Sequence, residues 1–207
     1  GSPRPDGRPC FSAGADLKER ENRPPTFGLE ANDLLNKIED MLKPSIAAID
    51  GVCTGGGIEL AMACDLRVVA ETAEVSDLHL KNLGHGLGGW GASTRLPRIV
   101  GLGKAKEMIL TALVLDGNEA VRAGFAQRVF PPGKVVEGAL EMARKAAAMR
   151  PHGVKLTLAH LDRAMNMPFY EGLRYADTVR RLLGPGPDAT AGYMAFVEGR
   201  APEWGKG

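Results

Sequence analysis

Residues 43–68 read KPSIAAIDGVCTGGGIELAMACDLRV, and this stretch decides the fold. The apolar run at 45–53 has the length and composition typical of a buried strand. A triple glycine follows at 55–57, after which 58–63 predict a helix and 66–70 a second strand. A strand, a helix and another strand within so few residues favour an α/β layered fold.

The remainder of the chain is predicted to be mainly helical. Apolar residues in 29–42 recur at helical spacing up to Pro44, which cannot continue a helix. Further helices are predicted over 103–113, 118–123, 134–149, 153–165, 168–183 and 188–198. We therefore expect an α/β core over 1–150 and a helical C-terminal subdomain over 151–207.

Composition and charge exclude several classes of protein. Lys and Arg total 26 against 25 Asp and Glu, a net charge of +1, which gives no reason to expect nucleic acid or a membrane as the main partner. No apolar run reaches the roughly 18 residues of a membrane span. The three cysteines form no CxxC pair, and the histidines and cysteines show no metal-ligand spacing. Reduced thiols and a cytoplasmic location are predicted, without a bound metal.

The triple glycine is the first candidate for chemistry. Without Cβ atoms, the backbone at 55–57 can approach a ligand closely, and the following helix presents unsatisfied N–H groups there. Such a place binds an anion or a developing oxyanion, although three glycines can also serve only as a tight turn. Glu59 follows two residues later, either as a favourable charge in the first helical turn or as a general acid or base.

A second small-residue turn lies in 11–19, which read FSAGADLKE. Small side chains there expose the backbone amide of Ala13, and Asp16 is placed to cap the next helix. In this order and at this separation, 11–19 and 43–68 resemble the signature of the enoyl-CoA hydratase/isomerase (crotonase) superfamily. The resemblance continues through TRLPRIVG (94–101), AKEMILTALVLDGNEAVRAGFAQRVFPP (105–132) and AFVEGRAPEW (195–204).

The resemblance implies a crotonase-type ββα spiral core and an acyl-CoA substrate. By motif, the amides of Ala13 and Gly56 hold the thioester oxygen, on which negative charge develops during the reaction. The expected substrate-binding residues are Ala13, Gly14, Ala15, Asp16 and Gly56. No separate cofactor is implied, because coenzyme A is part of the substrate. Relatives form trimers or dimers of trimers, so a homotrimer or hexamer is expected, in the cytoplasm or, in a eukaryote, the mitochondrial matrix.

The sequence departs from the family pattern at the second acid. Typical hydratases use two glutamates; the first matches Glu59, but His79 stands where the second is expected, with Asp77 as the nearest carboxylate. His79 or His85 can supply the missing acid/base group, because histidine titrates near neutral pH, or each can be a hydrogen-bonded structural residue. The loop at 81–91 is also longer than usual, and its G-x-G-x-x-G pattern lacks the context of a dinucleotide site.

Structural or solvent-exposed roles are predicted for the two tryptophans and for a charged cluster at 18–20. Trp90 and Trp204 are expected to pack against neighbouring residues instead of serving as stacking platforms. Lys18, Glu19 and Arg20 are expected to form a solvated cluster, with Lys18 or a nearby basic residue as an alternative contact for CoA phosphates.

Hydration of a 2-enoyl-CoA is the predicted reaction, with Glu59 activating water. The alternatives are isomerisation, thioester hydrolysis, or a non-catalytic relative that binds acyl-CoA or RNA. Family members carry several dozen residues ahead of the SAGAD block that form early strands. The sequence begins at Gly1, almost at this motif and without Met, so we expect those strands to be missing from it.

Overall fold

The computed structural model describes residues 7–184 and 187–205. These divide into two compact units. The first comprises the chain up to Glu39 together with Ser45–Glu141, and the second comprises Asp40–Pro44 and the chain from Met142 onward.

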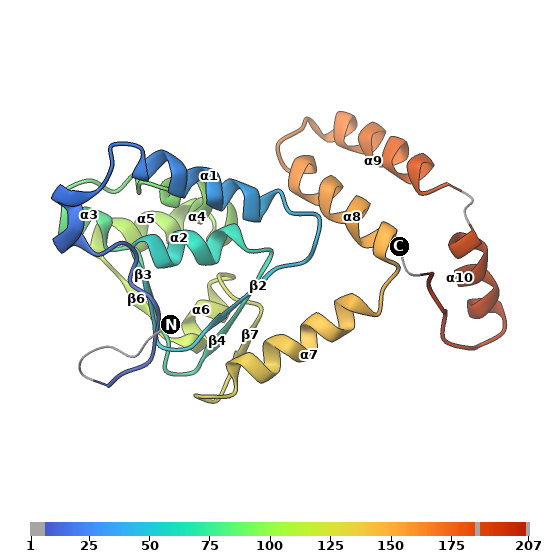
Figure 1. Cartoon of the computed structure of the whole chain (residues 1–207), viewed down its shortest axis with the longest axis horizontal. Helices are drawn as coiled ribbons and strands as arrows, with labels where there is room; N and C mark the ends of the chain where they lie inside the picture. Colours follow the sequence, from blue (N-terminus) through green and yellow to red (C-terminus); the bar gives the residue numbers. More distant parts are fainter. Residues whose placement is uncertain (1–6, 185–186, 206–207) are drawn as a thin grey trace. The chain divides into compact units, whose positions relative to one another are not determined.

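Two small sheets lie in the first unit (Figure 1). One has the strand order β1 (Cys10–Ser12), β3 (Val52–Thr54), β5 (Glu74–Ser76) and β6 (Val114–Leu115). The other has the order β2 (Ile46–Ile49), β4 (Leu66–Ala70) and β7 (Arg128–Phe130). All neighbours are parallel except β5 and β6. Because helices alternate with these strands, the α/β prediction is confirmed.

The prediction of a single strand over 45–53 is wrong, because the chain changes sheets within it. β2 belongs to the three-stranded sheet and β3 to the four-stranded sheet. The turn between them needs Gly51, whose φ is +82° and whose Cβ, if present, would lie 2.0 Å from the carbonyl oxygen of Pro9. A left-handed residue this close to another backbone segment can only be glycine.

The helices of the first unit carry most of its core. They are α1 (Phe27–Glu39), α2 (Gly56–Ala63), α3 (His79–Leu83), α4 (Ala92–Val100), α5 (Leu102–Thr111) and α6 (Gly117–Arg122), with a 3₁₀ helix, η1, at Leu17–Asn22. The central helix α2 contacts α1 and α4, and α4 packs against α5 (Figure 1). Ile58 and Ala61 on α2 are fully buried, so α2 is fixed on several sides.

A buried arginine ties β4 to the segments around it. The Arg67 side chain is 6% exposed, and its Nε donates to the carbonyl oxygen of Phe125 at 2.6 Å. Its Nη1 donates to the carbonyl oxygens of Cys64, at 2.7 Å, and Ala61, at 3.3 Å. Because the buried guanidinium satisfies three backbone carbonyl groups, its role is structural.

The second unit is helical, as predicted for the C-terminal region. α7 (Val135–Ala147) spans the boundary between the units, and α8 (Pro151–Ala164) packs against α9 (Phe169–Leu183) (Figure 1). α10 (Pro187–Val197) completes the unit. Trp204 packs as expected: its ring fills the space that a side chain at Gly192 would need, and its Nε1 donates to the carbonyl oxygen of Ala148 at 3.1 Å. Within the described part of the chain, no helix combines the length and the apolar character needed to cross a membrane.

Candidate active site

The two glycine-containing turns meet at one edge of the four-stranded sheet. β1 and β3 are adjacent and parallel, so the turns that follow them leave from the same end. A Cβ at Gly14 would lie 2.4 Å from the Gly56 nitrogen, and one at Gly57 would lie 2.0 Å from the Ser12 carbonyl oxygen. Only glycine permits this backbone-to-backbone approach, which brings Ala13 and Gly56 to the wall of one cavity of about 450 Å³.

The start of α2 lies at the wall of this cavity. Gly55 precedes the helix with a φ of +55° and offers no side-chain cap. Its carbonyl oxygen accepts from the amides of Ile58 and Glu59, so the amide of Gly56 lies ahead of the first intrahelical bonds. An uncapped helix N-terminus beside a cavity attracts negative charge.

Glu59 is buried beneath the cavity, with 1% of its surface exposed. Its Oε1 accepts hydrogen bonds from the backbone amides of Trp90, at 2.7 Å, and Ala92, at 3.1 Å. Burial raises the pKa of Glu59 above its ordinary value, and the bonds from those two amides oppose the shift. One oxygen is therefore held by the backbone, while Oε2 is directed toward His79.

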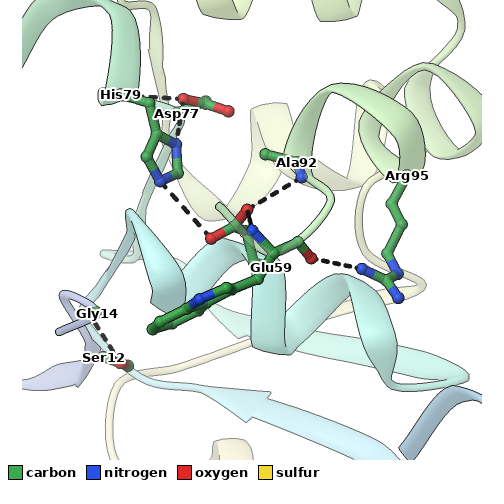
Figure 2. A network of polar contacts seen from close by, with 8 residues as sticks. Ser12, Gly14, Glu59, Asp77, His79, Ala92 and Arg95 are labelled. Atoms are coloured by element: carbon green, nitrogen blue, oxygen red, sulfur yellow. Dashed lines mark hydrogen bonds and ion pairs between the residues drawn. The ribbon is translucent and has the colours of Figure 1, made fainter. Parts of the chain in front are cut away.

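His79 begins α3 and lies between two carboxylates (Figure 2). Its Nε2 is 3.6 Å from Glu59 Oε2, and its Nδ1 is 2.9 Å from Asp77 Oδ1. The hydrogen bond to Asp77 raises the pKa of His79, burial opposes this, and the charges of Asp77 and Glu59 add to it. The Glu59 and His79 side chains thus form a close acid/base pair that faces the cavity.

The long glycine-rich loop is shaped to hold Glu59. Gly91 has a φ of +98°, and a Cβ at Gly88 would lie 2.5 Å from Glu59 Oε1. Arg95 anchors the loop through Nη1, which donates to the Trp90 carbonyl oxygen at 2.6 Å (Figure 2). The same guanidinium binds Glu39 on α1, with Nη2 2.6 Å from Oε2. The loop thereby keeps its two amides aimed at the buried carboxylate.

Most of the side chains and amides predicted for the site come together. Ala13, Ala15, Gly56, Glu59, His79 and His85 all line the cavity. Gly14 lies against Gly56 at the contact described above. Asp16 instead caps η1, as expected from its position, with Oδ1 accepting from the Lys18 amide at 2.9 Å.

Several lining residues were not predicted from the sequence. Trp90, predicted only to pack, also lines the cavity; its ring lies against Gly56 and 5.9 Å from the ring of Phe27. Arg23 lines it too, and so does Arg20, which is exposed as expected for the cluster at 18–20. The basic pair shortly after the SAGAD block was the available signal for these arginines, whereas nothing local marks Phe27. Among the described residues, no group of three or more His, Cys, Asp or Glu side chains is arranged to hold a metal ion.

Comparison with known proteins shows the family of the chain. The family model for enoyl-CoA hydratase/isomerase matches residues 6–207, and the chain belongs to this family. The crystal structure of an enoyl-CoA hydratase from Bacillus anthracis superposes with a TM-score of 0.87 at 33% identity, covering 93% of this chain and 75% of that one. The predicted superfamily and crotonase fold are therefore confirmed.

Two curated relatives show the same similarity in sequence. A probable enoyl-CoA hydratase from Rhizobium meliloti is 36% identical over 197 residues, which cover 94% of this chain and 76% of the relative. The mitochondrial methylglutaconyl-CoA hydratase of Homo sapiens is 34% identical over 202 residues. The match covers 94% of this chain but only 59% of the human protein.

Proposed function

We propose that the protein catalyses the hydration of 2-enoyl-CoA thioesters. The observation that carries the proposal is the meeting of Glu59 and His79 in the cavity that Ala13 and Gly56 line. A buried acid/base pair beside two backbone amides suits a reaction that passes through a thioester enolate. The names of the two curated relatives and of the Bacillus anthracis structure support hydration over other reactions of the family.

The proposed steps use four groups of this chain. The amides of Ala13 and Gly56 hold the thioester oxygen and stabilise the charge that builds on it; each such donor is typically worth about 3–4 kcal/mol. Glu59 takes a proton from water, whose oxygen bonds to C3 of the enoyl group while the C2–C3 π electrons move toward the thioester oxygen. His79 then gives the proton on Nε2 to C2, which completes the 3-hydroxyacyl thioester.

One proton transfer, from Glu59 to His79, returns both side chains to their starting protonation states. After the reaction Glu59 is protonated and His79 is neutral, and Glu59 Oε2 lies 3.6 Å from His79 Nε2. Because this separation is longer than a hydrogen bond, the proton returns to the imidazole through the next water molecule. We propose that no cofactor takes part besides the coenzyme A of the substrate, because each proton and electron pair in this sequence is accounted for.

We further propose that the protein forms a homotrimer or hexamer and acts in the cytoplasm, or in the mitochondrial matrix of a eukaryote. Large apolar side chains on the C-terminal unit support assembly, since Met165, Phe169 and Phe196 are 88%, 72% and 85% exposed. Light scattering after size-exclusion chromatography tests the assembly, and a monomer at micromolar concentration would contradict it.

The hydration of crotonyl-CoA tests the proposed reaction. Wild-type protein is expected to remove the absorbance of the conjugated thioester, and Glu59→Gln to slow this by about 100-fold or more. Product analysis separates the other reactions, because isomerisation leaves the substrate mass unchanged and hydrolysis releases free coenzyme A. Equal rates for wild type and Glu59→Gln would show that the role given to Glu59 is wrong.

A further inference from the structure

Asp77 is a fully buried carboxylate that the steps above do not use. It lies between the end of β5 and the start of α3 and has no exposed surface. Its Oδ1 accepts two hydrogen bonds from one residue: from the backbone amide of His79 at 3.0 Å and from the ring Nδ1 at 2.9 Å. Within residues 7–184 and 187–205, its Oδ2 has no hydrogen-bond partner.

This arrangement lowers the stability of the protein without benefit if Asp77 serves only the fold. A buried carboxylate with an unpartnered oxygen costs stability, and an asparagine or serine could accept from the His79 amide at a lower cost. The bond from the His79 amide therefore does not explain why the residue is charged. The second bond, to the imidazole, does.

The bond to Nδ1 decides which ring nitrogen is free. A carboxylate only accepts, so Nδ1 carries a proton and the ring cannot turn without losing this bond. Nε2 is then the nitrogen that faces the cavity and Glu59. Its 3.6 Å separation from Glu59 Oε2 is longer than a hydrogen bond, so the proton on Nε2 is available to a third group.

We propose that Asp77 is a positioning residue that holds His79 as an imidazolium with Nε2 toward the cavity, so that this site pairs a carboxylate with an imidazolium instead of using two glutamates. The inference rests on the proposed function for the role of the Nε2 proton as the one delivered to C2. The fixed ring orientation and the charge on His79 stand independently of that function.

The charges around His79 also favour its protonated form. The hydrogen bond that His79 donates to Asp77 is the largest cause that raises the pKa of His79, and the charge on Glu59 raises it further against the effect of burial. With Asp77 and Glu59 ionised, a protonated His79 leaves this group of three with one net negative charge instead of two. Loss of the charge at position 77 removes the main support for the imidazolium.

Other charged groups lie on the elements around His79. Arg20, Arg23 and His85 line the same cavity from η1 and from the loop after α3. On α3 itself Lys81 is exposed, and on the adjacent α5 Lys104 pairs with Glu107 at the surface. None of these groups is among the causes that shift the pKa of His79, so its raised pKa is attributable to the two carboxylates.

Asp77→Asn separates the effect of the charge on the ring from the bond to the backbone, because the asparagine oxygen can still accept from the His79 amide while the charge is lost. The alkaline limb of the kcat/KM profile is expected to shift down by about 1–3 pH units, and kcat at neutral pH to fall about tenfold or more. Asp65→Asn is the matched control: Asp65 binds the Ser45 amide at 2.6 Å and is not among the residues that line the cavity, so the profile is expected to keep its shape.

Nitrogen-15 NMR of the histidine rings gives a readout independent of activity. In wild type, His79 is expected to titrate above its ordinary value and to keep the Nδ1–H form when neutral; in Asp77→Asn the titration is expected to move down. A wild-type His79 that titrates at or below 6.5, or an Asp77→Asn protein with unchanged titration and pH profile, would overturn the proposal. If the NMR result holds but crotonyl-CoA is not hydrated, the proposed function fails while the positioning role stands.

Discussion

Gly14→Ala places a methyl group between the two turns that form the proposed oxyanion site. The added Cβ would lie 2.4 Å from the Gly56 nitrogen and 3.0 Å from its Cα. Both atoms are backbone, so no side-chain rotation relieves the overlap. Gly56 also has the Trp90 ring against it, since a Cβ at Gly56 would lie 2.1 Å from Cζ3 of that ring.

The losses of rate and stability expected for Gly14→Ala follow from these distances. Ordinary contact begins at 3.4 Å, so the turns must separate by about 1 Å (3.4 − 2.4), and a displacement of this size can cost about 100-fold in rate. Misplacing one oxyanion donor costs a similar factor, about 100- to 1,000-fold in kcat. Gly14 also has a φ of +86°, where a Cβ costs roughly 1–2 kcal/mol, so a drop in unfolding free energy of about 2–4 kcal/mol is expected with the overpacking.

Steady-state hydration of crotonyl-CoA measures kcat, and circular dichroism with urea unfolding measures the fold and its stability. Gly103→Ala is the matched control, because Gly103 lies in α5 with nothing within 4 Å of its added Cβ. It is expected to leave kcat unchanged and to stabilise the helix by about 0.5–1 kcal/mol. A folded Gly14→Ala protein with kcat within threefold of wild type would refute the reasoning.

Three further substitutions test the supporting structure. Glu59→Gln is expected to raise the unfolding free energy at pH 7 while slowing hydration by about 100-fold or more. Burial raises the folded-state pKa of Glu59, so the carboxyl stabilises the fold below its unfolded pKa and loses that contribution as pH rises through its folded pKa. The gain should vanish below pH 4 in urea titrations, and a gain independent of pH would contradict this sign. Arg95→Lys is expected to lower kcat about tenfold with little change in KM, because the Trp90 carbonyl loses its anchor and the loop amides loosen around the carboxylate; a change confined to KM would show another cause. Arg67→Met is expected to lower the unfolding free energy by about 2–4 kcal/mol, since the Phe125 carbonyl and its neighbours lose a buried donor, without altering kcat of the folded protein; a loss of kcat greater than the loss of folded protein would contradict a purely structural role.

The sequence predicts the regular elements of the fold better than its turns. The strand at 66–70 and the helices from 103 onward agree with the structure to within about two residues, because each has a clear apolar pattern and a defined end. β1, β5 and β7 have three residues each, which is too short for a period to show. α4 was not predicted, since it contains Pro97 and begins at a left-handed glycine, both of which usually mark an end.

The residues of the site also differ in how well the sequence predicts them. Ala13, Gly56 and Glu59 are marked by local patterns of small residues, and His79 by its place in the family pattern. The contact between Asp77 and His79 joins residues two apart, yet its importance depends on the burial of both, which sequence spacing does not reveal. Trp90 reaches the cavity only because the loop that carries it folds over Gly56, an arrangement set by tertiary packing.

The most direct test of the central claim is the reaction of crotonyl-CoA in water labelled with oxygen-18, followed by mass spectrometry of the intact thioester. Hydration at the cavity of Ala13, Gly56, Glu59 and His79 predicts 3-hydroxybutyryl-CoA with one labelled oxygen on C3, formed about 100-fold more slowly by Glu59→Gln. Label found only in a released carboxylate, or labelled product formed at equal rates by both proteins, would contradict it.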